Sequence, residues 1–264
     1  MTDAIIQRHT LACDLARRGG AAALDFFNRR DTLAVEAKAT PQDVVSRADR
    51  EVEVLIRKVI LGAFPEDAII GEEDAPKSGT SGFTWVIDPI DGTMPFLSGL
   101  PHGCVAIAVV EGDRTVAAAT FAPVHDLLYD ARTGGGFRCD GVDQQVSRDL
   151  AITDAMTAVG ASHRTPPGDA AGVIERLLLA GGAYYRNGSG AMMLADVAAG
   201  RLAGYFEPHM NAWDCLGGLL MIEEAGGRCK SFAMADMLSA GGRVLAAAPR
   251  AYKALCDICG DQQG

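Results

Sequence analysis

The most informative stretch of the chain is Trp85-Val86-Ile87-Asp88-Pro89-Ile90-Asp91-Gly92-Thr93. Its apolar beginning predicts a buried strand, and the strand runs into two carboxylates. Pro89 fixes its own φ and Gly92 permits a sharp turn, so both carboxylates can converge at the end of the strand instead of alternating across it. Taken alone, the stretch predicts either an acidic turn or part of a cation site.

Two more segments of the chain deliver acids in a similar way. Upstream, the short apolar run 68–71 leads into Glu72-Glu73-Asp74, and downstream Asn211-Ala212-Trp213-Asp214 places an acid at an expected helix start. Taken alone, the first segment is also typical of a solvated loop, and the second is also typical of a helix N-cap. Together, carboxylates at three element ends, without His or Cys beside them, favour a hard divalent cation such as Mg²⁺ or Mn²⁺ over zinc.

Around these motifs, the spacing of apolar residues predicts alternating helices and strands. Helices are expected at residues 3–27, 43–61, 173–179, 191–199, 213–225 and 249–259. Strands are expected at 68–70, 83–87, 105–110, 115–121, 157–159, 202–206, 228–230 and 244–248, with a hairpin turn at 111–113. The pattern predicts an α/β (α+β) layered sandwich with an N-terminal lobe, residues 1–145, and a C-terminal lobe, residues 146–264.

Composition and charge exclude several classes of protein. The chain has 264 residues and a net charge of −10, and 48% of its residues are hydrophobic, which is ordinary for a globular protein. The excess of acid argues against nucleic-acid binding, and no apolar run is long enough to span a membrane. The chain shows no secretory signal, so a cytoplasmic protein is expected, and the seven scattered cysteines predict free thiols.

Six short motifs occur in a fixed order along the chain. They are KATPQDVVSRAD at residues 38–49, GEE at 71–73, DPIDGT at 88–93, GSGA at 188–191, WD at 213–214 and EEAGG at 223–227. In this order they resemble the motifs of the inositol monophosphatase family of lithium-sensitive, magnesium-dependent phosphatases, over essentially the whole chain. The resemblance implies an αβαβα sandwich of the sugar-phosphatase type and hydrolysis of a small phosphate ester.

The resemblance also implies which residues bind metal. A first Mg²⁺ would be bound by Glu72, Asp88 and the main-chain carbonyl of Ile90. A second would be bound by Asp88, Asp91 and Asp214, and a third, weaker ion would again use Glu72. Divalent cations suit this chemistry because they neutralise the phosphate dianion and lower the pKa of an attacking water.

Further roles follow from the same resemblance. Asp49 and Thr93 would orient and deprotonate the attacking water, with Glu72 as the third catalytic residue. Gly92 and Thr93 would offer main-chain N–H groups to the phosphate at a helix N-terminus. Pro95, in the first turn of that helix, stands where the family often has an amide side chain.

Three residues are implied to contact the organic part of the substrate: Gly190, Glu207 and Asn211. Gly190 stands where the family commonly has Ala, which predicts a roomier wall. No second acid lies between Glu207 and Asp214, and one carboxylate suffices to recognise hydroxyl groups, so a small polyol phosphate such as inositol monophosphate is favoured.

Several alternatives stay open. The segment Phe96–Pro101 resembles the family branch that acts on histidinol phosphate, and other sugar or nucleotide phosphates are further candidates. A non-enzymatic alternative is a binding protein of the transcription machinery, because bacterial members of the family can associate with it. The resemblance also suggests a homodimer.

Overall fold

Helices and strands alternate along the whole chain, as the sequence predicts. The computed structural model describes residues 3–30, 35–37 and 44–261. Its elements are α1 (Asp3–Asn28), β1 (Val35–Ala37), β2 (Val44–Ser46), α2 (Arg47–Ala63), β3 (Ala68–Gly71), β4 (Phe83–Asp91), α3 (Thr93–Leu97), β5 (Cys104–Glu111), β6 (Arg114–Ala122), β7 (Leu127–Arg132), β8 (Phe137–Cys139), β9 (Val142–Gln144), β10 (Met156–Val159), α4 (Pro167–Leu179), β11 (Ala183–Tyr185), α5 (Gly190–Ala198), β12 (Gly204–Met210), α6 (Ala212–Glu224), β13 (Arg228–Cys229), α7 (Met234–Ala240), β14 (Gly242–Ala247) and α8 (Pro249–Cys259).

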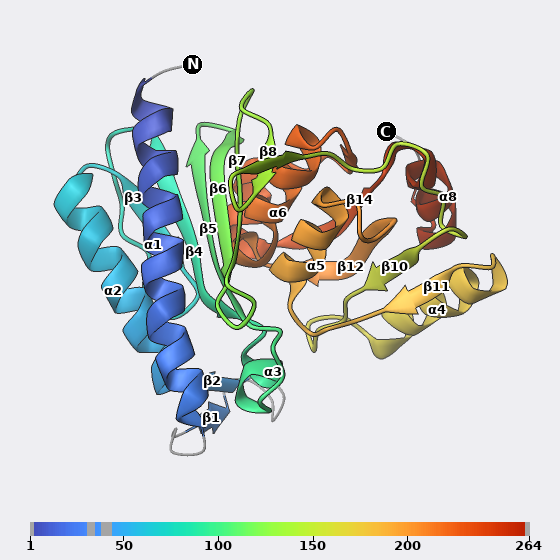
Figure 1. Ribbon diagram of the computed structural model, residues 1–264, viewed down its shortest axis with the longest axis horizontal. Coiled ribbons are helices and arrows are strands. Elements are labelled where there is room, and N and C mark those ends of the chain that lie inside the picture. The colour runs from blue at the N-terminus through green and yellow to red at the C-terminus, as the bar shows by residue number, and fades with distance from the viewer. Residues whose placement is uncertain (1–2, 31–34, 38–43, 262–264) are drawn as a thin grey trace.

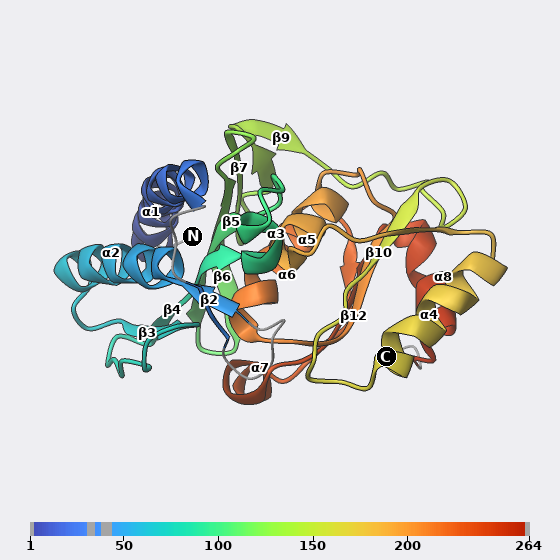
Figure 2. The same ribbon diagram turned by 90° about the horizontal axis from the view of Figure 1, so that it is seen from below.

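The elements form five layers (Figure 1). A seven-stranded sheet has the order β3-β4-β5-β6-β7-β8-β9, and a five-stranded sheet has the order β11-β10-β12-β14-β13. Helices α1 and α2 cover the outer face of the first sheet, α5 and α6 lie between the two sheets, and α4 and α8 cover the second sheet, as Figure 2 also shows. This arrangement confirms the predicted αβαβα sandwich.

Strand β4 shows why the first sheet must be covered on both faces. Side chains alternate along a strand, so Trp85 and Ile87 pack against α1 and α2, whereas Val86 faces the opposite core with α5 and α6. The neighbouring strands β5 and β6 are buried almost throughout. Each face therefore needs apolar side chains, which explains the nearly continuous apolar runs of the sequence.

The core between the sheets joins the two halves of the chain. Residues of β4 to β8 pack there with residues of α5, α6 and β12. The division into lobes at residue 145 stays a prediction. Among the described residues, no helix is long and apolar enough to cross a membrane. All seven cysteines are free thiols, as expected.

The second helix begins later than predicted. Residues 38–43 lie outside the described residues, and Val44–Ser46 forms strand β2, so the expected start at residue 43 is wrong. Helix α2 begins at Arg47, because Ser46 caps it: the Ser46 side chain accepts from the N–H of Ala48, and Asp49 accepts from the N–H of Ser46. The short strands β7 to β9 and β11 were not anticipated either.

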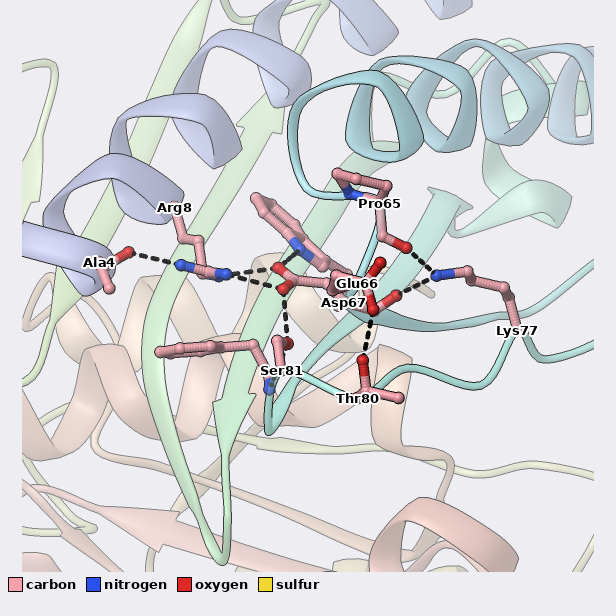
Figure 3. A network of polar contacts seen from close by, with 10 residues as sticks. Ala4, Arg8, Pro65, Glu66, Asp67, Lys77, Thr80 and Ser81 are labelled. Atoms are coloured by element: carbon pink, nitrogen blue, oxygen red, sulfur yellow. Dashed lines mark hydrogen bonds and ion pairs between the residues drawn. The ribbon is translucent and has the colours of Figure 1, made fainter.

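A buried ion pair fixes α1 to the segment before β3 (Figure 3). The carboxylate of Asp67 accepts two hydrogen bonds from the Arg8 guanidinium, at 2.8 and 2.7 Å, and one each from Ser81 and the Trp85 indole. Arg8 also lies over the ring of Phe83, with 3.8 Å to its centroid. Burial acts to raise the pKa of Asp67, but these donors outweigh it and hold the pKa below the ordinary value.

We expect Asp67→Asn to lower the free energy of unfolding by about 3–5 kcal/mol, because it leaves the buried Arg8 charge without its partner. Denaturant unfolding at neutral pH measures the effect. The control is Asp25→Asn, which removes the exposed partner of Arg29 on the same helix and should cost about 1 kcal/mol or less. Since the pKa of Asp67 is lowered, its contribution should persist at neutral pH and disappear as the pH falls below about 4. Equal losses in both variants would contradict this account.

Candidate active site

A β-bulge brings Asp88 and Asp91 to one side of β4. Asp88 pairs with Ala106 of β5 and Asp91 with Cys104, so three steps along β4 match two steps along β5. Without the extra residue, side chains three positions apart would point to opposite faces. The bulge lies at Pro89 and Ile90 and produces the convergence of the two acids that the sequence predicts. The N–H of Ile90 donates to Asp88 Oδ1 at 3.0 Å.

The third carboxylate of the group comes from the other half of the chain. Asp214 lies in the first turn of α6, where it accepts from the N–H of Asn211 at 3.0 Å. One carboxylate oxygen from each of Asp88, Asp91 and Asp214 lies within 4.8 Å of the others. The structure therefore brings together three acids that the sequence places up to half a chain apart.

Among the described residues, these three carboxylates have no counter-charge from the protein. Burial, with repulsion from Glu72 and Asp91, raises the pKa of Asp88 well above its ordinary value. Burial and the same two neighbours raise the pKa of Asp214 as well. Within the described ranges, no Lys or Arg forms an ion pair with any of the three. An oxygen-only, uncompensated set of this kind fits Mg²⁺ or Mn²⁺, which would supply the missing positive charge.

Asp91 is held by the N-terminus of α5, a contact that sequence reasoning missed. Its Oδ2 accepts from Ser189 Oγ at 2.5 Å and from the N–H of Ala191 at 2.7 Å. Burial nevertheless raises the pKa of Asp91 to about 6. Ser189 also caps α5 by accepting from the N–H of Met192. A Ser directly before an apolar helix is an N-cap signal that could have identified it.

Asp49 and Thr93 lie together, although 44 positions separate them. Thr93 Oγ1 lies 3.1 Å from Asp49 Oδ1 and 3.1 Å from the carbonyl oxygen of Ile90. Asp49 is buried, and burial raises its pKa even though Ser46 donates two hydrogen bonds to it. Gly92, directly before Thr93, has φ 85°, where an added Cβ would lie 2.9 Å from the carbonyl oxygen of His102.

A cavity of about 1060 Å³ opens over these side chains. The predicted site residues that line it are Glu72, Asp88, Ile90, Asp91, Gly92, Thr93, Gly190, Glu207 and Asp214. Asp49 lies behind Thr93. Asn211 is not among the lining residues, since it occupies the N-cap of α6, and its role toward the substrate stays a prediction.

Glu207 lines the same cavity as the carboxylates assigned to metal binding. A second bulge, between Glu207 and Met210 of β12, brings both side chains into the cavity. Glu207 accepts a hydrogen bond from the hydroxyl of Tyr205, and burial raises its pKa to about 7. The roomier wall expected at Gly190 is not found, because the methyl group of Met210 lies 2.5 Å from the place of an added Cβ.

The loop that carries Glu72 is held by a buried pair on α2 that sequence reasoning also missed. Glu53 accepts from the N–H groups of Glu73 and Asp74, at 2.8 and 3.1 Å, and pairs with Arg57 at 2.6 Å. Arg57 in turn donates to the carbonyl of Asp74. Gly71 makes this approach feasible, since an added Cβ there would lie 2.2 Å from Glu53 Oε1.

We expect Glu53→Gln to weaken Mg²⁺ binding by about 10–100-fold, because the loop of Glu72 loses the charged acceptor that orients it. Calorimetric titration of the folded variant with Mg²⁺ measures this without relying on activity. Glu51→Gln on the same helix is the matched control: its partner Arg47 is exposed, so Mg²⁺ affinity should stay at the wild-type value. Wild-type affinity in Glu53→Gln would show that the pair does not position Glu72.

Comparison with known proteins agrees with the fold. A layered αβαβα sandwich with three carboxylates gathered at element ends is the arrangement that the sequence resemblance implies. The chain belongs to the inositol monophosphatase family, whose sequence model matches residues 7–262.

Its relatives carry two kinds of name. The inositol-1-monophosphatase of Rhizobium meliloti is 37% identical over 204 residues, which are 76% of each chain. The Nus factor SuhB of Pasteurella multocida is 36% identical over 247 residues, which are 92% of each chain. Among solved structures, SuhB of Bartonella henselae has a TM-score of 0.88 at 28% identity and covers 95% of this chain and 97% of its own. An IMPase of Thermotoga maritima has a TM-score of 0.84 at 27% identity, covering 96% and 97%.

Proposed function

We propose that this protein is a Mg²⁺-dependent phosphomonoesterase that hydrolyses a small polyol phosphate, with inositol monophosphate as the first candidate. The observation that carries the proposal is the group Asp88, Asp91 and Asp214, uncompensated by any described cation and facing the same cavity as Thr93. Membership of the inositol monophosphatase family supports the reaction class. Mn²⁺ can replace Mg²⁺ at such a site.

The protein's own residues supply ligands, orientation and proton transfer. Divalent cations bound by Glu72, the Ile90 carbonyl and the three aspartates would neutralise the phosphate and lower the pKa of the attacking water. The Thr93 hydroxyl donates one proton, so while it donates to Asp49 its lone pairs can accept from that water. The raised pKa of Asp49 makes this carboxylate a better proton acceptor than an exposed one. Gly92 and Thr93 would offer N–H groups to the phosphate.

The environment of Glu207 favours a substrate whose organic part is a polyol over one whose organic part is an amino alcohol. With its pKa near 7 and the Tyr205 hydroxyl already on it, this carboxylate is only partly charged at neutral pH. Such a group can accept from substrate hydroxyls but pairs poorly with an ammonium group. Histidinol phosphate, which carries an ammonium group, is therefore the less favoured ester.

The substrate assignment is tested by kcat/KM for inositol 1-phosphate and histidinol phosphate, on the wild type and on Glu207→Gln. We expect the wild type to favour inositol 1-phosphate. A wild type that favours histidinol phosphate by about tenfold or more, with the preference lost in Glu207→Gln, would reject the polyol and leave the metal ligands as assigned.

A second function is supported by the relatives named Nus factor SuhB, which align with nearly the whole chain. We propose that the protein also associates with transcription complexes, beside its catalysis. Co-purification of RNA polymerase with wild type and with Asp88→Asn tests this: association should survive in both, and absence from both would reject it. A homodimer and a cytoplasmic location stay predictions.

A further inference from the structure

The far end of the cavity differs in charge from the metal-ligand end. Its wall is formed by the loop after β10, residues 160–165, by the first turns of α4, and by the residues that follow β11. Among the described residues that line it, Arg164 and Arg186 are the only Lys or Arg. All the lining carboxylates lie at the other end or, in the case of Glu207, between the two ends.

The two arginines belong to one small region of the fold. Strands β10 and β11 pair in parallel, so the residues that follow both strands emerge at the same edge of the second sheet. Arg186 Nη2 donates to the carbonyl oxygen of Ala161 at 3.2 Å, which fastens it to the loop that carries Arg164. Both positive charges also act on Glu207, since they partly oppose the rise of its pKa that burial causes.

In the part of the chain that the structure describes, the two arginines have no ion-pair partner. Among the described residues, no carboxylate forms an ion pair with either guanidinium. Both side chains are exposed, and the α4 residues that line the same end of the cavity, Ala170, Ala171 and Ile174, are apolar. Guanidinium groups in this setting are suited to bidentate recognition of a carboxylate or phosphate.

The size of the cavity leaves room for such a group. A volume of about 1060 Å³ is at the upper end of the range that holds drug-sized ligands, and a polyol monophosphate is smaller than these. With divalent cations on the carboxylates, both ends of the cavity would attract anions, and Glu207 would lie between them.

We propose that the substrate carries a second acidic group, a carboxylate or a phosphate, which Arg164 and Arg186 bind while the reacting phosphate lies at the metal ligands. The inference rests on the proposed phosphatase function and refines its substrate: a polyol phosphate with an additional anion would be preferred to inositol monophosphate itself. The arginines would set specificity through binding, since they lie apart from the reacting atoms.

The test uses two matched pairs of esters. Inositol 1-phosphate and inositol 1,4-bisphosphate differ by a second phosphate, and glucose 1-phosphate and glucuronic acid 1-phosphate differ by a carboxylate. In at least one pair we expect kcat/KM to be about tenfold or more higher for the ester with the second anion, through a lower KM. The pair that shows the preference tells which acidic group the arginines bind.

Arg164→Gln and Arg186→Gln should each reduce that ratio by about tenfold. Arg114→Gln is the matched control, because it removes an exposed arginine from the β5–β6 hairpin, away from the cavity, and should leave the ratio at its wild-type value. Equal kcat/KM values within both pairs, or a preference that survives both cavity variants, would overturn the inference and leave the proposed function standing. If no ester is hydrolysed, the proposed function fails instead. The inference is then tested by calorimetric Kd values of the same four esters: within each pair, the Kd of the ester with the second anion is compared with the Kd of the ester without it, in the wild type and in both cavity variants.

Discussion

Asp88→Asn is expected to lower kcat for phosphate release by at least ~1000-fold, because a neutral amide cannot supply the negative charge that the proposed cations would need. The fold should remain intact, since Asn has nearly the same shape and can still accept from the N–H of Ile90. Initial rates at saturating Mg²⁺, with circular dichroism on the same sample, measure both expectations.

The same variant should behave differently in metal-free buffer. There burial, together with repulsion between the carboxylates, raises the pKa of Asp88 in the wild type. Removing one charge should therefore leave thermal stability equal or higher at neutral pH, whereas the rise in Tm that Mg²⁺ gives the wild type should be reduced. A variant that is unfolded, or one that keeps the full Mg²⁺-dependent rise in Tm, would contradict the assignment of Asp88 as a shared ligand.

The second large effect is expected at Thr93. Thr93→Val keeps the shape of the side chain but removes the hydroxyl between Asp49 and the attacking water, so kcat should fall by about 10²–10⁴-fold with little change in KM. Thr93→Ser restores the hydroxyl and should recover most of the activity. Single-turnover and steady-state rates for inositol 1-phosphate provide the comparison.

Two results would reject this role. One is a Thr93→Ser variant as inactive as Thr93→Val, which would assign the loss to packing. The other is a phosphorylated protein intermediate trapped during turnover, which would show covalent catalysis in place of an oriented water.

Much of the fold could be predicted because its signals are local. The hairpin at residues 111–113 appears as two strands joined where Glu111 pairs with Arg114. The closing helix, residues 249–259, has its predicted bounds. Pro89 and Gly92 indicated the convergence of two acids, and the bulge at this place is its structural basis.

Other features depend on tertiary packing that no local pattern encodes. Glu53 with Arg57 and Glu51 with Arg47 are both pairs four residues apart on α2, and in sequence they look alike. Only the close approach of Gly71 makes the first pair buried and important for the site.

The same reason explains other elements that were missed. Strands β8 and β9 are three residues long, too short for a period of two to be recognised. β8 pairs with β7, and β9 pairs in turn with β8. Arg164 and Arg186 are 22 positions apart, and the parallel pairing of β10 with β11 brings them to one wall.

The central claim is that the group Asp88, Asp91 and Asp214 binds the cations on which phosphate-ester hydrolysis depends. The most direct measurement is inorganic phosphate release from inositol 1-phosphate by chelator-treated protein as Mg²⁺ is added back. We predict no turnover without Mg²⁺ and saturable recovery in the wild type. Turnover that continues undiminished in excess chelator would contradict the claim.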